Sequence, residues 1–252
     1  MKKLRVFFRA ALIPLLLVGC APQEKEGSAE LAAAKYQLGV AYFEAGNYRA
    51  AVPELSQAAD LDPANAEYRN ALGMALLFNR KLDPAIKVFE EAIGVDPKNT
   101  EIKNNLASAY IMKGELDKAK PLLKQVLDDP LYPTPQFAYF NLARIYERQG
   151  NIDEAIEQYE LALDIRPEYV DAHYNLGLLY LQQGRTDRAI EQFSAATRLS
   201  PKIAVYQQSL GVAYVKAGRY QEARIAFEKV LQIEPNSSSA EYARRMLQEL
   251  KQ

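Results

Sequence analysis

The sequence of 252 residues predicts an all-α fold, a right-handed superhelix of six helix-turn-helix repeats closed by one C-terminal helix. Three observations predict this fold. A Leu followed by Gly or Ala recurs at spacings of 34, 34, 36, 34 and 34 residues, from Leu38 to Leu210. Small and large residues alternate at helical spacing within each repeat, and a Pro closes most repeats. Since one helix pair cannot bury its apolar face alone, such repeats stack on one another.

The first 19 residues have the pattern of a secretory signal. Four Lys and Arg residues precede a short apolar run that ends at Gly19. A bilayer core needs about 20 apolar residues, so this run is too short to span one. We therefore expect residues 1–19 to be removed as a signal peptide and not kept as an anchor helix.

Cys20 follows this segment and is the only Cys in the chain. The tetrapeptide Leu17-Val18-Gly19-Cys20 resembles the lipobox of bacterial lipoproteins, which implies cleavage before Cys20 and lipidation of its thiol. The alternative is an ordinary secretory signal with a chance Cys, which would leave an unpaired thiol in an oxidising compartment. Several acyl chains on one residue would hold the protein firmly to a membrane, and this anchor is the only membrane contact expected.

The residue after the Cys is Ala21. In the sorting rule known for many Gram-negative lipoproteins an Asp at this place favours the inner membrane, so the resemblance implies an outer-membrane protein facing the periplasm. Residues 20–31 comprise the lipidated Cys and a polar stretch without aromatic or β-branched residues, which predicts a flexible tether.

Removal of the signal would take away four positive charges and no acidic residue. The mature chain would then carry 27 Lys and Arg (31 − 4 = 27) against 32 Asp and Glu. Recognition of phosphates needs a basic stripe, and a mildly acidic chain does not supply one. No nucleic-acid partner is expected.

The repeats are expected at 32–65, 66–99, 100–133, 136–169, 170–203 and 204–237, with a capping helix over 238–252. A Gly or Ala on the first helix of each repeat admits a bulky residue of the second helix. This pattern with a period of 34 residues resembles the tetratricopeptide repeat family over nearly the whole mature chain. Two departures stand out: Arg80 replaces the Gly of the other turns, and the third junction is two residues longer.

That longer junction reads Asp129-Pro-Leu-Tyr-Pro-Thr-Pro135. Its three prolines preclude a continuous helix. One interpretation is a surface loop without a role, since connecting segments tolerate insertions. The other comes from a narrower resemblance. Leu131-Tyr132-Pro133 followed by Phe140-Asn141-Leu142 is similar to the third junction of type IV pilus biogenesis lipoproteins, which implies a pilotin that helps the secretin pore reach the outer membrane and assemble.

Members of the tetratricopeptide family bind partners in a concave groove lined by the first helix of each repeat. Carried onto this chain, the resemblance implies an apolar groove with two cations near its middle, suited to an amphipathic helix or an extended apolar segment. The candidate groove residues are Tyr36, Val40, Met74, Phe78, Asn104, Met112, Phe137, Phe140, Arg144, Arg148, Tyr174, Leu178 and Val212. Chaperone-tail adaptors of the family clamp a terminal carboxylate with Lys, Asn and Arg, and that set is missing here.

No enzyme is expected. Catalysis needs a base within hydrogen-bond reach of an activated group or a metal, and the sole His, His173, stands at a position that packs between two helices. One imidazole without ligand partners makes neither a metal site nor a triad. The sequence therefore predicts no cofactor, no metal and no small-molecule substrate.

Together these interpretations predict a lipid-anchored interaction scaffold whose partner is a protein. The sharpest version is a type IV pilus pilotin that binds a secretin subunit. The alternative is an adaptor for other envelope machinery, such as peptidoglycan hydrolases, polysaccharide export or outer-membrane protein assembly.

Overall fold

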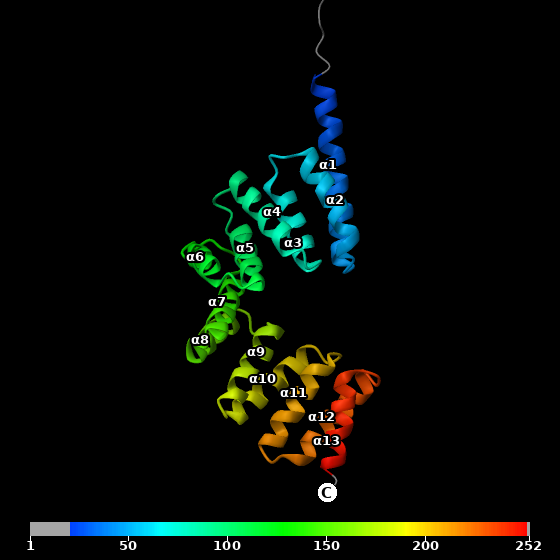
Figure 1. The fold of residues 1–252 in the computed structure, drawn as a ribbon, viewed down its shortest axis with the longest axis vertical. Helices are drawn as coiled ribbons and strands as arrows, with labels where there is room; N and C mark the ends of the chain where they lie inside the picture. The colour runs from blue at the N-terminus through cyan, green and yellow to red at the C-terminus, as the bar shows by residue number, and fades with distance from the viewer. Residues whose placement is uncertain (1–20, 251–252) are drawn as a thin grey trace, which may run out of the picture.

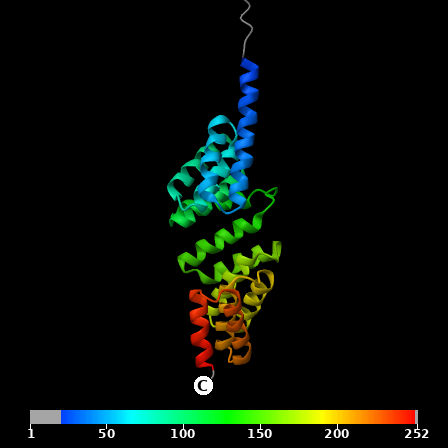
Figure 2. The same ribbon diagram turned by 90° about the vertical axis from the view of Figure 1, so that its right-hand side faces the viewer.

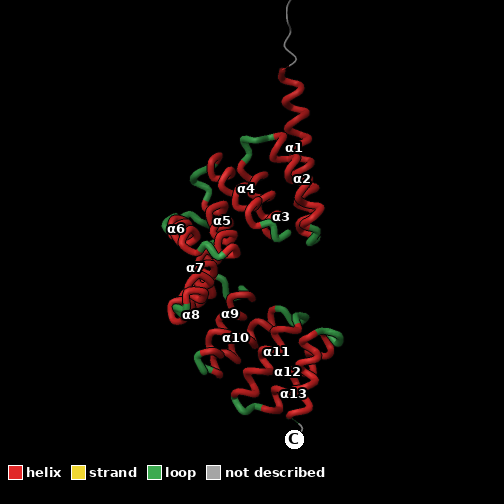
Figure 3. The backbone as a smooth tube through the Cα atoms, viewed as in Figure 1, coloured by secondary structure: helices red, strands yellow, loops and turns green. Residues whose placement is uncertain are grey.

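A computed structural model describes the backbone of residues 21–250 and the side chains from residue 27 onward, so the signal segment and Cys20 lie outside the described residues. Within residues 21–250 the chain forms thirteen helices and no strand, which confirms the predicted fold class (Figures 1 and 3). The helices are α1 (Ala21–Glu44), α2 (Tyr48–Leu61), α3 (Ala66–Phe78), α4 (Leu82–Val95), α5 (Thr100–Lys113), α6 (Leu116–Leu127), α7 (Pro135–Gln149), α8 (Ile152–Ile165), α9 (Val170–Gln182), α10 (Thr186–Leu199), α11 (Ala204–Lys216), α12 (Tyr220–Ile233) and α13 (Ser238–Glu249).

Consecutive helix pairs stack along the long axis of the molecule, with α1 at one end and α13 at the other (Figure 2). Each helix packs mainly on its neighbours in the chain. The first helices also contact the first helix of the next repeat, as in α1 with α3, α3 with α5, α5 with α7 and α9 with α11. One face of the stack is therefore built from first helices.

The interior of each repeat joins a small residue on the first helix to a large one on the second. In four repeats the small residue is Gly, and a Cβ built on it would lie within 2.5–2.7 Å of the large side chain. These pairs are Gly39 with Leu55, Gly73 with Phe89, Gly177 with Phe193 and Gly211 with Phe227. The large residues are fully buried, so the predicted small and large pattern is the packing of the core.

The turn inside each repeat needs a residue in the left-handed region. Five repeats use Gly there, with φ between 72° and 90°, and Gly supplies this conformation without steric penalty. The second repeat has Arg80 with φ 60°, the only non-Gly residue with positive φ in the described chain. A side chain at such a place is strained.

Several helix starts are capped by side chains. Asn65 accepts hydrogen bonds from the backbone N–H groups of Glu67 and Tyr68, and Asn99 accepts one from Ile102. Each cap satisfies a backbone donor that the first turn of a helix leaves unpaired.

The structure corrects the predicted tether. Helix α1 begins at Ala21, so residues 21–31 form the first part of a 24-residue helix and not a flexible linker. This stretch is rich in Ala, Glu, Gln and Lys, which favour helix, and its Pro22 lies in the first turn, where a missing N–H is tolerated. In Figure 1 the beginning of α1 projects beyond α2. None of the described helices is both long and apolar enough to span a membrane.

The longer third junction connects α6 to α7, and its residues Leu131 and Tyr132 differ in burial. The Tyr132 side chain is buried in the core around α5 and α6, whereas Leu131 is 86 % exposed. Asp129 fixes the turn between them, because its carboxylate accepts from the N–H of Leu131 and its carbonyl accepts from the N–H of Tyr132. Tyr132 thus anchors the insertion to the fold.

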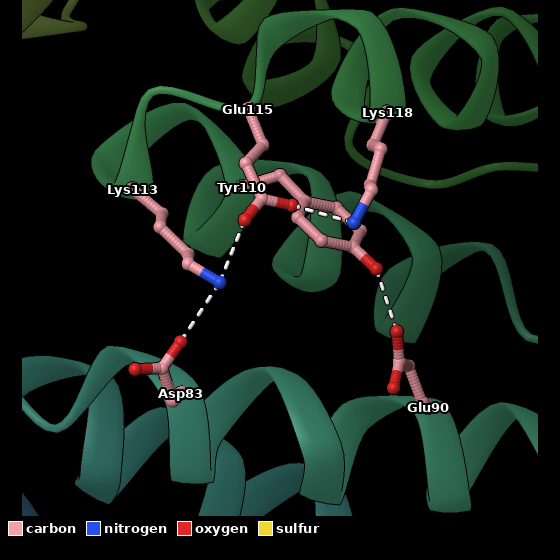
Figure 4. A network of polar contacts seen from close by, with 6 residues as sticks. All are labelled: Asp83, Glu90, Tyr110, Lys113, Glu115 and Lys118. Carbon is pink, nitrogen blue, oxygen red and sulfur yellow. Dashed lines mark hydrogen bonds and ion pairs between the residues drawn. The ribbon is translucent and has the colours of Figure 1, made fainter.

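A polar network joins the second repeat to the third (Figure 4). Lys113 of α5 contacts Asp83 of α4 at 2.8 Å and Glu115 at 2.6 Å, and Lys118 contacts the other Glu115 oxygen at 2.7 Å. Beside this chain of charges, the Tyr110 hydroxyl donates to Glu90 at 2.6 Å. The Tyr110–Glu90 hydrogen bond and the Lys113–Asp83 ion pair join α5 to α4, and the Glu115 pairs join α5 to α6.

Candidate partner-binding groove

The first helices of repeats two, three and four enclose a cavity of about 570 Å³, which we call the central cavity. Helices α3, α5 and α7 supply most of its lining. The lining residues are Tyr48, Met74, Leu77, Phe78, Arg80, Asn104, Asn105, Ser108, Met112, Phe137, Phe140, Asn141, Arg144 and Tyr169. Apolar and aromatic side chains dominate, which is the usual character of a binding pocket.

Aromatic clusters form two walls of the central cavity. On one side Tyr169 packs on Phe140 with ring centroids 4.9 Å apart and on Phe137 at 5.5 Å. On the other side Phe78 packs on Tyr48 at 5.1 Å. Phe78 remains 48 % exposed, so its ring is accessible from solvent. Such rings offer a large contact area for a partner.

Asparagine side chains connect the helices beneath the cavity. The Asn141 amide of α7 donates to the Asn104 carbonyl oxygen of α5 at 3.1 Å, and Asn105 of α5 donates to Asn70 of α3 at 3.0 Å. Asn104 and Asn141 are both buried, at 6 % and 5 % exposure. Their amides therefore fix adjacent first helices at a set distance, since a buried amide without a partner is unfavourable.

Arg144 introduces a charge into this apolar surface. Its guanidinium is half-buried and lies 6.0 Å from the Phe140 ring centroid, and its nearest hydrogen-bond acceptor is Asn141 at 3.5 Å. Burial lowers the pKa of Arg144, and the neighbouring Arg148 lowers it further by repulsion. Among residues 27–250 no carboxylate lies within ion-pair distance of Arg144.

A second cavity of about 370 Å³ adjoins the first and shares Met74 with it. Helices α1, α3 and α5 supply most of its lining, with Leu55 from α2 and Asn99 from the N-cap of α5. The lining residues are Tyr36, Val40, Phe43, Leu55, Glu67, Asn70, Ala71, Met74, Asn99, Glu101 and Ile102. The Tyr36 hydroxyl donates to Glu67 at 2.7 Å, and burial together with this carboxylate raises the pKa of Tyr36. We call this the N-terminal cavity.

The structure brings together most of the predicted groove residues. Seven line the central cavity, namely Met74, Phe78, Asn104, Met112, Phe137, Phe140 and Arg144, and Tyr36 and Val40 line the N-terminal cavity. Asn104 contributes a buried amide that already has a partner.

Four predicted residues line neither cavity. Arg148 donates to the Ile111 carbonyl oxygen. Tyr174 packs on Tyr206 at 4.9 Å, Val212 packs against the last core cluster, and Leu178 is 37 % exposed on α9. The groove residues that the structure gathers thus lie in repeats one to four.

The candidate groove residues do not include seven that line the central cavity, namely Tyr48, Leu77, Arg80, Asn105, Ser108, Asn141 and Tyr169. A signal existed for two of them. Tyr169 is the N-cap residue of α9, but its side chain makes no capping hydrogen bond. The equivalent N-cap residues of α3 and α5 are Asn65 and Asn99, which do cap their helices. Arg80 occupies a turn where the other repeats have Gly. Each residue replaces the locally favoured type, which is expected where a side chain has another role.

His173 has two neighbours that account for it. Its Nδ1 lies 2.7 Å from the Gln192 amide oxygen and its Nε2 lies 2.8 Å from the Pro167 carbonyl oxygen. The ring therefore links α9 to α10 and to the preceding loop. Within the described residues no group of three His, Cys, Asp or Glu side chains is placed to hold a metal ion.

A family model described as tetratricopeptide repeat matches residues 36–99, 104–170, 140–204 and 174–238, and a second model of the same description matches 76–130. The chain is a tetratricopeptide repeat protein. Members of this family are scaffolds for protein interactions. No curated protein matches the sequence at a significant level.

Solved structures share this tetratricopeptide fold. PilW, described as a widely conserved type IV pilus biogenesis factor, superposes with a TM-score of 0.74 at 21 % identity over 88 % of this chain and 99 % of PilW. Pseudomonas aeruginosa PilF superposes with a TM-score of 0.71 at 19 % identity over 89 % of this chain and 98 % of PilF. YrrB, described as having an unusual peptide-binding site, gives 0.54 at 18 % identity over 76 % and 97 %. In fold, this tetratricopeptide protein resembles type IV pilus biogenesis factors.

Proposed function

We propose that the protein is an outer-membrane lipoprotein that acts as a type IV pilus pilotin, binding a secretin subunit in its groove. The observation that carries the proposal is the central cavity, an apolar and partly aromatic surface on the first helices of repeats two to four. An exposed apolar surface of this kind is typical of protein-binding sites. A fold that extends over nearly the full length of PilW and PilF supports the choice of pilus biogenesis.

In this proposal the lipid on Cys20 determines where the protein works. Because α1 begins at the next residue, the anchor would continue directly into a helix of 24 residues. At 1.5 Å per residue this helix is about 36 Å long. The groove would therefore be held at a set distance from the membrane, and the stack of repeats would fix the orientation of a bound secretin segment relative to the lipid.

The role of Cys20 is tested by Cys20→Ser. The variant should lose its lipid and leave the membrane fraction, while its helical content by circular dichroism stays that of the parent protein. A correctly processed variant that remains fully in the membrane fraction would contradict the proposed anchor.

The partner is tested by photocrosslinking in living cells from a probe that replaces Phe78. This position lines the central cavity and is 48 % exposed, so a probe there faces a partner with little disturbance of the core. The matched control is a probe at Tyr220, which is 55 % exposed at the start of α12 and lines neither cavity.

A secretin subunit attached from position 78 and not from position 220 is the expected result. Peptidoglycan hydrolases or export proteins attached from position 78, without a secretin, would instead assign the groove to other envelope machinery. Equal attachment from both positions would contradict specific binding in the groove.

A further inference from the structure

The central cavity has an unbalanced charge. Two arginines line it, the exposed Arg80 from the turn after α3 and Arg144 from α7, and no Asp or Glu is among its lining residues. Neither arginine lies within ion-pair distance of a carboxylate among residues 27–250. Among residues 27–250 only Arg166 and Arg219 are arginines with an ion pair, so Arg80 and Arg144 differ from the other unpaired arginines in lining one cavity together.

Arg144 is unfavourably placed in the absence of a partner. It is half-buried beside the Phe140 ring and is repelled by Arg148 of the same helix, while Glu147 attracts it only from beyond ion-pair distance. A guanidinium that has lost water is stabilised most by a carboxylate, because the fork of N–H donors matches the two oxygens. The site therefore favours an incoming carboxylate over a neutral group.

Arg80 is an independent observation that favours the same chemistry. Its φ of 60° is the left-handed conformation that Gly adopts in the other five turns, so the chain keeps a strained Arg where Gly is preferred. Strain of this kind at a cavity indicates a role for the side chain. Arg80 lines the central cavity and is exposed, so its side chain is free to meet an occupant there.

The N-terminal cavity has the opposite charge. It is lined by Glu67 and Glu101, with no Lys or Arg, and it adjoins the central cavity through Met74. A segment that filled both cavities would pass Met74 as a continuous chain, and the carboxylate that reached Arg144 would then belong to a side chain within the segment and not to the end of a chain.

We propose that the central cavity binds an internal segment of a partner protein in which one Asp or Glu stands among bulky apolar residues, and that Arg144 and Arg80 pair with its carboxylate. The inference rests on the proposed function and adds the chemistry of the bound segment to it. The apolar side chains would fill the space between Met74, Phe78 and Phe140, and the acidic residue would fix the register of the segment.

The test is a selection of short random peptides displayed on phage, fused through their C-terminal ends so that no terminal carboxylate is free. Three proteins serve as targets: the parent, Arg144→Met, and the control Arg188→Met on α10, whose arginine lines neither cavity. Arg→Met keeps an unbranched apolar side chain and removes the charge together with the N–H donors. Selected peptides are then synthesised with Gln in place of Glu or Asn in place of Asp, and their affinities are measured by fluorescence anisotropy.

The expected result is enrichment of apolar peptides with one acidic residue on the parent and on Arg188→Met. We expect the Gln or Asn peptide to bind the parent about tenfold more weakly, and to bind Arg144→Met as well as its acidic counterpart does. Arg80→Gly should reduce the preference for the acidic peptide in the same direction.

Two results would overturn the proposal. One is enrichment of apolar peptides that lack an acidic residue and lose affinity when Phe78 is replaced. The groove would then remain a binding surface, but the pairing of its arginines with a carboxylate would be wrong. A library that gives no enrichment on the parent would mean that the cavity does not hold such a segment. In that case a secretin crosslinked from position 78 would still support the proposed function, with a different mode of contact.

Discussion

Gly73 of α3 lies directly against the ring of Phe89 in α4. A Cβ built on Gly73 would lie 2.5 Å from Cε1 of Phe89, a distance that real Cβ atoms essentially never show. Phe89 is fully buried, so the ring has no solvent space to enter. The backbone of the first helix is thus itself the surface on which the second helix packs, and this contact sets how closely α3 approaches α4.

Replacing Gly73 with Ala should lower the free energy of unfolding by about 2 kcal/mol. Adding a methyl group to a filled core forces side chains or backbone to move, which typically costs about 1–3 kcal/mol. Urea denaturation followed by circular dichroism measures the change. Gly94→Ala in α4 is the matched control, because nothing lies within 4 Å of the Cβ it would add. That variant should gain about 0.5–1 kcal/mol from helix propensity, and an equal effect of both substitutions would refute the packing argument.

Replacing Arg80 with Gly should raise the free energy of unfolding by about 1 kcal/mol, because the left-handed conformation is unfavourable by about 1–2 kcal/mol for a residue with a Cβ. The reverse substitution, Gly114→Arg, places the same side chain in a turn with φ 90° and should lower stability. Thermal denaturation of both variants checks the pair. An Arg80→Gly variant less stable than the parent would show that the arginine side chain stabilises the fold by more than its backbone strain.

Replacing Asn141 with Ala should lower the free energy of unfolding by about 1–3 kcal/mol, because it leaves the buried Asn104 carbonyl oxygen without its donor. Asn175→Ala serves as the control. Asn175 stands at the same repeat position on α9, and the position that Asn104 occupies in the third repeat is Phe140 in the fourth. Chemical denaturation distinguishes the two. Similar losses at both positions would mean that the amide bridge adds nothing beyond local packing.

The network around Glu115 should weaken in acid. Hydrogen bonds from Lys113 and Lys118 lower the pKa of the Glu115 carboxyl below its ordinary value of 4.5. A carboxyl whose pKa is lower in the folded state stabilises the fold above the unfolded pKa, and this contribution disappears as the pH falls through the folded pKa. We therefore expect Glu115→Gln to be less stable than the parent at neutral pH and equal to it in strong acid. Denaturation at several pH values between about 7 and 3 measures this difference. A difference independent of pH would contradict the assignment.

The repeat pattern made the fold predictable because its packing is local. The small residue at Gly73 and the large one at Phe89 are separated by half a period, and the same pair recurs at Gly177 and Phe193. Such a spacing specifies both the helix pair and the contact between its members. The Asn caps at Asn65 and Asn99 were predictable for the same reason, since they act on the next few residues.

The remaining features depend on contacts between repeats, or on the balance between helix and linker, and the repeat pattern specifies neither. The start of α1 was predicted as a tether from its polarity, but polarity does not distinguish a solvated helix from a linker. Tyr174 and Val212 stand at groove positions of the repeat, yet one packs on Tyr206 and the other on the last core cluster. The curvature between repeats decides which of the equivalent positions share a cavity, and this is a property of the whole stack.

The central claim is that partners bind on the first helices of repeats two to four. The most direct measurement is the affinity of the purified protein for a purified secretin subunit, compared between the parent, Phe78→Ser and Tyr220→Ser, by titration calorimetry. We predict that Phe78→Ser weakens binding at least about tenfold, as loss of an aromatic anchor does, and that Tyr220→Ser leaves the affinity unchanged. Equal affinities for the parent and Phe78→Ser, with both proteins folded, would contradict the claim.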